Sequence, residues 1–179
     1  MKRGNNYIMF NGQQIAMIGK SGSSAIAKAI YIDGRDDVSE VMLLSNGPGF
    51  QHRVPQTQEA NCPIIPVRDP VERFRSACAQ EDRTAAQEIS RIERNRYSFH
   101  TKPTSAYLVE GATLYKFPEH IKEIARDLGL DEISRVNDSN SNNSPKPILT
   151  DKELERVEEL YADDISLYNS IEKAGQIYC

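Results

Sequence analysis

The chain has 179 residues, of which 39% are hydrophobic and 27% are charged, a composition typical of a globular domain that buries a core. Its formal net charge of −4 argues against a general nucleic-acid-binding protein, so any recognition of an anion must be local. The sequence holds no apolar run near the roughly 20 residues that span a bilayer, and no apolar signal-peptide region. We therefore expect one domain over residues 1–179, in the cytoplasm and without membrane contact.

Two short strands are predicted first, at Tyr7–Phe10 and Gln14–Ile18. They flank Asn11-Gly12, a pair that favours a hairpin turn because both residues tolerate positive φ. A loop rich in Gly, Ser and Lys follows at Gly19–Ser24, and a helix is expected to begin at Ser23. The order of these elements is strand, loop, helix.

The loop Gly19–Ser24 is a candidate anion site. Backbone N–H groups at the start of a helix lack partners within the helix, and the helix dipole is positive there, so a phosphate-like or sulfate-like group can bind. Lys20 adds a full positive charge. The segment ends like a Walker A loop, but that motif needs a glycine where Gln14 stands. A relative of the P-loop architecture that binds another phosphorylated cofactor stays open, as does an ordinary strand-to-helix turn.

Two further strands are predicted at Val41–Leu44 and Pro63–Val67, separated by a loop that carries His52. Arg68 follows the second of them, and Asp69-Pro70 is typical of an N-cap and the first position of a helix. Ligands of open α/β sheets bind beyond the carboxyl ends of the strands, which makes Arg68 a second anion signal.

The rest of the chain alternates in the same way. A helix is predicted over Glu81–Tyr97, with Ile89 and Ile92 on its inward face, then a strand at Thr113–Phe117. The later predictions are a helix from Glu119 to Leu128 that ends at Gly129, a flexible loop over 135–147, and one long final helix from the capping box Thr150–Glu153 to near Gly175. This alternation predicts an α/β fold with a mainly parallel, P-loop-like central sheet flanked by helices.

The three cysteines, Cys62, Cys78 and Cys179, are widely spaced and lack paired CxxC spacing. This pattern argues against a zinc site or a disulfide framework, so we expect free thiols and no metal.

Two segments resemble the cofactor-binding motifs of sulfotransferases. Residues 67–76, VRDPVERFRS, are similar to the strand-to-helix pattern R-[DN]-P-x-x-R-x-x-S that binds a 3′-phosphate in those enzymes. Residues 20–24, KSGSS, are similar to their 5′-phosphosulfate loop, although Gly19 stands where those enzymes usually have proline. Three later segments resemble the carbohydrate (heparan- and chondroitin-type) branch: HTKPTSAYL from His100, LYKFPEHI from Leu114 and YADDISLY from Tyr161. The similar segments keep the family's order over roughly residues 15–170.

The resemblance implies that the cofactor is 3′-phosphoadenosine 5′-phosphosulfate (PAPS) and the product adenosine 3′,5′-bisphosphate. The 5′ end would contact Lys20, Ser21, Gly22, Ser23 and Ser24, with Lys20 stabilising charge on the leaving phosphate oxygen. Arg68 and Ser76 would hold the 3′-phosphate. The acceptor would be a small molecule or a carbohydrate. These roles agree with the chemistry, because sulfuryl transfer, like phosphoryl transfer, needs mainly positioning and charge stabilisation.

The acceptor hydroxyl also needs a general base. His52 is one candidate, because it follows the carboxyl end of a strand and imidazole titrates near neutral pH. His100 is the other, because it occupies the position of the family's histidine. Two other functions stay open: a P-loop-type nucleotide or metabolite kinase, and a nucleotide-binding module without catalytic activity.

Overall fold

A computed structural model describes residues 7–33, 56–57, 61–134 and 145–179 of the chain. Its centre is a six-stranded sheet in the order β3-β1-β2-β4-β5-β6. The strands are β1 (Tyr7–Phe10), β2 (Gln13–Ala16), β3 (Gln56–Thr57), β4 (Ile64–Arg68), β5 (Thr113–Phe117) and β6 (Gln176–Ile177). Strands β2, β4 and β5 are parallel neighbours, whereas β1 and β6 run antiparallel to the strands beside them. An α/β fold with mostly parallel strands is therefore confirmed, while the predicted strand Val41–Leu44 lies outside the described residues.

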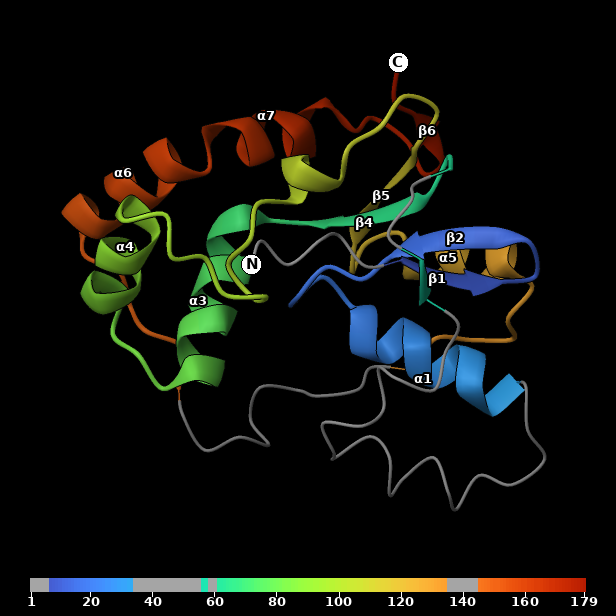
Figure 1. Ribbon diagram of the computed structural model, residues 1–179, viewed down its shortest axis with the longest axis horizontal. Coiled ribbons are helices and arrows are strands. Elements are labelled where there is room, and N and C mark those ends of the chain that lie inside the picture. The colour runs from blue at the N-terminus through green and yellow to red at the C-terminus, as the bar shows by residue number, and fades with distance from the viewer. Residues whose placement is uncertain (1–6, 34–55, 58–60, 135–144) are drawn as a thin grey trace.

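Helices cover both faces of the sheet (Figure 1). The helices are α1 (Ser23–Asp33), α3 (Pro70–Glu81), α4 (Ala85–Glu93), the 3-10 helix η2 (Thr104–Tyr107), α5 (Ile121–Leu128), α6 (Asp151–Leu160) and α7 (Ala162–Ser170). Apolar side chains of α1 and α5 pack on one face, against Ile15, Ile64 and Tyr115. Side chains of η2 and α7 pack on the other, against Ile65 and Leu114. The sheet is thus buried on both sides, as parallel sheets usually are.

The N-terminal hairpin forms as its sequence predicts. Asn11 and Gly12 adopt φ values of 47° and 77°, and Phe10 pairs with Gln13 across the turn. Two successive residues with positive φ match the twist of the strands, which is why Asn-Gly is favoured there.

The predicted helix Glu81–Tyr97 is wrong in its bounds. Helix α3 begins at Pro70, as Asp69-Pro70 predicts, and is capped by the Asp69 side chain, which accepts a hydrogen bond from the Glu72 N–H at 2.8 Å. It runs to Glu81 and ends because Asp82 adopts a left-handed conformation (φ 51°). A new capping box at Thr84 then starts α4, which ends at Glu93. Ile89 and Ile92, expected on the inward face, are buried.

The prediction of one long final helix is also wrong, because the structure has two helices there, α6 and α7. The capping box at Thr150 is present as expected, but the helix is interrupted at Tyr161, where φ is −116°. The Tyr161 side chain turns inward there, and its hydroxyl donates to the Thr101 carbonyl at 2.6 Å. Helix α7 ends at Ser170, and Gly175 lies beside β6, where its N–H donates to the Leu114 carbonyl at 3.1 Å. Of the predicted loop 135–147, residues 145–147 are described and form no regular element.

A third apolar cluster extends the fold beyond the carboxyl edge of the sheet. It joins α3, α4 and α6 through Phe74, Cys78, Ile89, Val157 and Tyr161. This cluster packs α3 against α4 and α6. All three cysteines are free thiols, as expected. Within the described residues, no helix has the length and apolar character needed to cross a membrane.

Candidate functional site

The loop between β2 and α1 has an unusual backbone. Lys20 adopts a φ of 64° and Gly22 a φ of 81°, a region that glycine enters easily and lysine rarely does. A Cβ atom at Gly22 would collide with the Phe117 ring, so a larger residue cannot replace this glycine without movement. Helix α1 begins at Ser23, and the N–H groups of its first turn therefore have no partner within the helix. Ser23 is buried and Ser24 is exposed on that turn.

Arg68 lies directly beside this loop. It is the last residue of β4, which pairs in parallel with β2, so both strands end at the same edge of the sheet. The Arg68 Nη1 donates a hydrogen bond to the Lys20 carbonyl at 2.9 Å. The structure thus brings together the two anion signals of the sequence, which are 48 residues apart.

The cations at this edge act on one another. Burial lowers the pKa of Lys20, and the charge of Arg68 lowers it further. Burial also lowers the pKa of Arg68. The Lys20 ammonium donates to the neutral side-chain oxygen of Gln80, at the end of α3, at 2.9 Å. A bound anion would relieve the repulsion between these cations, because opposite charges nearby favour the charged form.

Lys146 is a third cation that acts on Lys20, since its charge also lowers the pKa of Lys20. Its ammonium lies 3.2 Å from a carboxylate oxygen of Glu72 on α3. One residue further on, the Pro147 carbonyl accepts a hydrogen bond from the Arg75 Nε at 2.9 Å. Lys146 and Pro147, the last two residues of the predicted loop, are thus bonded to side chains of α3.

Two buried hydroxyl groups at this edge have no hydrogen-bond partner among the described residues. They are the side chains of Ser21, which is fully buried, and Ser76, which is 4% exposed. Ser76 lies one turn before Gln80 on α3, and thus on the helix face that contacts Lys20. A buried hydroxyl left without a partner costs about 1–3 kcal/mol, so both are positions where a ligand atom can supply the missing bond.

His100 closes the site from the other side. Burial and the charge of Lys20 lower its pKa, so its imidazole is neutral at neutral pH. Its Nδ1 is buried and has no partner among the described residues, and its Nε2 lies 3.9 Å from a carboxylate oxygen of Glu81. His52, the other candidate base, and the strand expected before it lie outside the described residues.

Gly19 lies against the backbone of the segment that carries His100. A Cβ atom at this position would lie 2.5 Å from the Phe99 carbonyl oxygen and 2.8 Å from the His100 Cα. The two backbones therefore touch, and the site where the family usually has proline has no room for a side chain here.

The segment that carries His100 is held by a buried ion pair which sequence reasoning missed. Arg73 and Asp164 are each 1% exposed and lie 3.1 Å apart. Arg73 donates to the Lys102 carbonyl at 2.8 Å, and Asp164 accepts from the backbone N–H groups of Thr104 at 2.7 Å and Ser105 at 2.8 Å. The two residues are 91 positions apart in the chain, and no local signal in the sequence pairs them.

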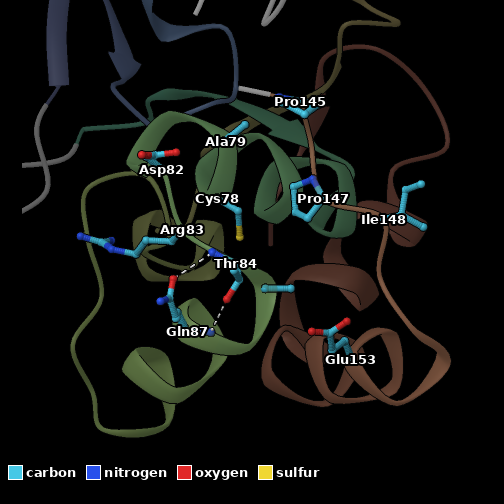
Figure 2. A pocket seen from close by; sticks show the side chains of 11 residues that line it. Cys78, Ala79, Asp82, Arg83, Thr84, Gln87, Pro145, Pro147, Ile148 and Glu153 are labelled. Carbon is cyan, nitrogen blue, oxygen red and sulfur yellow. Dashed lines mark hydrogen bonds between the residues drawn. The ribbon is translucent and has the colours of Figure 1, made fainter. Parts of the chain in front are cut away.

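The structure also contains a cavity of about 380 Å³ away from this site, between the end of α3, the starts of α4 and α6, and residues 145–148 (Figure 2). None of the predicted site residues lines it. Thr84 and Gln87, two of its polar residues, bond each other in the capping box of α4. Of its charged residues, Arg83 pairs with Glu81 and Glu88, and Glu153 bonds Thr150.

Comparisons with protein-family models, with curated proteins and with solved structures found no match. In the described parts of the chain, no group of three or more His, Cys, Asp or Glu side chains is placed to hold a metal ion. The proposed chemistry of the site therefore rests on its own residues.

Proposed function

We propose that the protein is a sulfotransferase that uses PAPS as the sulfuryl donor and a hydroxyl of a sugar or other small polar molecule as the acceptor. The observation that carries the proposal is the hydrogen bond from Arg68 to the Lys20 carbonyl. It joins two cations at the edge of the sheet where the buried hydroxyls of Ser21 and Ser76 have no partner among the described residues. A donor with phosphate groups at both ends of its sugar matches such a pair of anion sites.

The proposed roles follow from position. Lys20 and the N–H groups at the start of α1 bind the 5′ end, where negative charge develops on the leaving oxygen. Arg68 and Ser76 bind the 3′-phosphate, Arg68 with up to two parallel hydrogen bonds. Burial strengthens these contacts, because charges interact more strongly away from bulk water.

A thermal-shift titration tests the proposal. Adenosine 3′,5′-bisphosphate should raise the melting temperature more than ATP at equal concentration, since a ligand at about 100 times its Kd stabilises the native state by ~2.7 kcal/mol. A larger shift with ATP would contradict the proposal and favour the kinase. Binding of the bisphosphate without sulfate transfer from PAPS to any acceptor would instead favour a nucleotide-binding module.

A further inference from the structure

The two nitrogen atoms of His100 have different surroundings. Nδ1 is buried and packs against Gly19, since a Cβ atom there would lie 3.0 Å from it. An acceptor hydroxyl has no path to this nitrogen. Nε2 lies 3.9 Å from a carboxylate oxygen of Glu81, beyond hydrogen-bond distance. Because Nδ1 is enclosed by the backbone and Nε2 faces Glu81, the carboxylate is a second candidate proton acceptor beside the imidazole.

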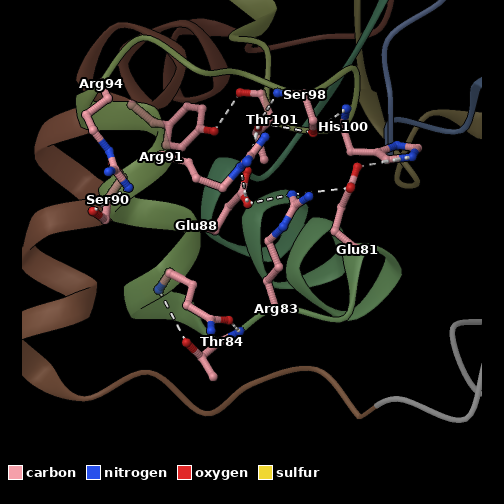
Figure 3. Close-up of polar contacts among 12 residues, drawn as sticks. Glu81, Arg83, Thr84, Glu88, Ser90, Arg91, Arg94, Ser98, His100 and Thr101 are labelled. Atoms are coloured by element: carbon pink, nitrogen blue, oxygen red, sulfur yellow. Dashed lines mark hydrogen bonds and ion pairs between the residues drawn. The ribbon is translucent and has the colours of Figure 1, made fainter.

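Glu81 is fixed on its other side by a charge network that reaches from partly exposed side chains to the buried Glu88 (Figure 3). The Arg83 guanidinium lies 3.2 Å from one Glu81 oxygen and 2.9 Å from an oxygen of Glu88. Glu88 is fully buried, and it also accepts a hydrogen bond from the Thr101 hydroxyl at 3.2 Å.

The same network returns to His100 through the backbone. The Thr101 hydroxyl lies 3.2 Å from the Ser98 hydroxyl, which accepts a hydrogen bond from the His100 N–H at 3.1 Å. Polar contacts therefore form a closed ring that starts at the His100 ring and ends at the His100 backbone. Such a ring fixes the Glu81 carboxylate relative to the imidazole.

Glu81 also acts on Lys20. It follows Gln80, whose side chain accepts the hydrogen bond from the Lys20 ammonium. The negative charge of Glu81 raises the pKa of Lys20 and of His100, against the larger effect of burial in each case. The Glu81 side chain is 22% exposed, so a substrate hydroxyl can reach it.

We infer that Glu81 is the general base of the proposed sulfuryl transfer and that His100 is a positioning residue that holds its carboxylate. In this step the acceptor oxygen forms a bond to sulfur as its proton moves to a Glu81 oxygen. The bond between sulfur and the 5′-phosphate oxygen of PAPS breaks, and its electron pair stays on that oxygen, beside Lys20. The inference rests on the proposed function, and it places Glu81 instead of His100 in the role of base, while His52 lies outside the described residues.

Glu81→Gln tests the role directly, because it keeps the shape of the side chain and removes its basicity. We expect kcat with PAPS and desulfated glycosaminoglycan oligosaccharides to fall ~10²-fold to 10⁴-fold, the usual contribution of a general base. The Kd for adenosine 3′,5′-bisphosphate should change less than threefold. Glu93→Gln is the matched control, since Glu93 is an exposed glutamate that pairs with Arg156 on another helix, and its kcat should match that of the wild type.

Chemical rescue separates a base from a structural residue. Sodium formate should restore part of the lost kcat in Glu81→Ala, because a small carboxylate can occupy the space and accept the proton, and it should leave His100→Ala unchanged. A Glu81→Gln enzyme with wild-type kcat, or a Glu81→Ala enzyme that formate does not rescue, would overturn the role of Glu81. A wild type that neither binds the bisphosphate nor turns over PAPS would overturn the proposed function itself.

The pairing of Glu81 with His100 has a test that needs no activity. The charges that act on His100 are Lys20 from the loop, and Glu81 and Arg73 from α3. The chain has three histidines, and the His100 signal in an NMR titration is assigned by its loss in His100→Gln. Its pKa should be lower in Glu81→Gln than in the wild type, because a nearby negative charge is lost. An unchanged pKa would overturn the pairing, whatever the enzyme assays show.

Discussion

The ion pair of Arg73 with Asp164 and the cluster around Lys20 and Arg68 lie close together in the fold, but their charges are arranged in opposite ways. In the first, two fully buried opposite charges meet at 3.1 Å and bind four backbone groups of the segment 100–105. In the second, two cations lie together and two buried hydroxyls lack partners among the described residues. The charges of the first region balance without a ligand, although the buried Arg73 Nε has no hydrogen-bond partner among the described residues. In the second region, we propose that an anion supplies the opposing charge. Stability and binding should therefore respond differently to mutation in the two regions.

The largest effect on stability is expected at the ion pair of Arg73 with Asp164. Asp164→Ala leaves Arg73 buried without an opposing charge and frees the N–H groups of Thr104 and Ser105. Breaking one partner of such a pair destabilises a protein by ~3–5 kcal/mol. Urea denaturation should show this loss in the free energy of unfolding. A loss below 1 kcal/mol would mean that the pair does not hold the segment.

Gly19→Ala tests the contact between the two regions. Its Cβ would meet the backbone of Phe99 and His100, which cannot yield as a flexible side chain can. We expect a loss of ~1–3 kcal/mol, typical of overpacking, in the same denaturation experiment. Gly12→Ala is a useful contrast, because nothing lies within 4 Å of a Cβ there, and its effect reports the strain of positive φ alone.

Ser76→Ala should separate stability from binding. Because the Ser76 hydroxyl is buried without a partner among the described residues, its removal should leave the free energy of unfolding unchanged or raise it by up to ~1 kcal/mol. The affinity for adenosine 3′,5′-bisphosphate should fall about tenfold, as expected from one lost hydrogen bond to a charged group. Calorimetry and urea denaturation of the same variant measure both quantities. A destabilised variant with unchanged affinity would mean that Ser76 contributes to stability and not to binding.

The smallest effect is on the pH dependence of stability. Burial and Lys20 lower the pKa of His100 in the folded state, so the unfolded chain binds a proton more readily. Stability should therefore fall as the pH decreases below about 6.5, the ordinary histidine value, and this contribution should be absent above it. Denaturation at pH 5 and pH 8 should show a smaller pH effect in His100→Gln than in the wild type. An equal pH effect in both proteins would assign the titration to another group.

Local patterns in the sequence predicted much of the fold and of the site. The Asn11-Gly12 turn, the Asp69-Pro70 helix start and the Thr150 capping box depend on neighbouring residues, and each is present. The approach of Arg68 to Lys20 followed from the parallel order of two strands. The turn and the two helix starts are each determined by residues that are close together in the chain.

What the sequence could not show depends on contacts between distant residues. The break at Tyr161 forms because its hydroxyl binds a carbonyl 60 residues away. Glu81 was assigned to the start of a helix, and its proximity to His100 appeared only once α3 ended at that residue. The contacts of Gly19 with Phe99 and of Arg73 with Asp164 likewise need the packed fold, because no spacing in the chain encodes them.

The central claim is that Arg68 and the Lys20 loop form one two-ended anion site. It is tested most directly by comparing two nucleotides that differ only in the 3′-phosphate. Calorimetry should compare adenosine 3′,5′-bisphosphate with adenosine 5′-monophosphate, on the wild type, on Arg68→Ala and on Arg94→Ala, the control, whose exposed guanidinium bonds Ser90 on α4. The wild type and Arg94→Ala should prefer the bisphosphate at least tenfold, as a charge-assisted contact implies. Arg68→Ala should bind both nucleotides equally. A wild type without that preference, or an Arg68→Ala protein that keeps it, would contradict the account.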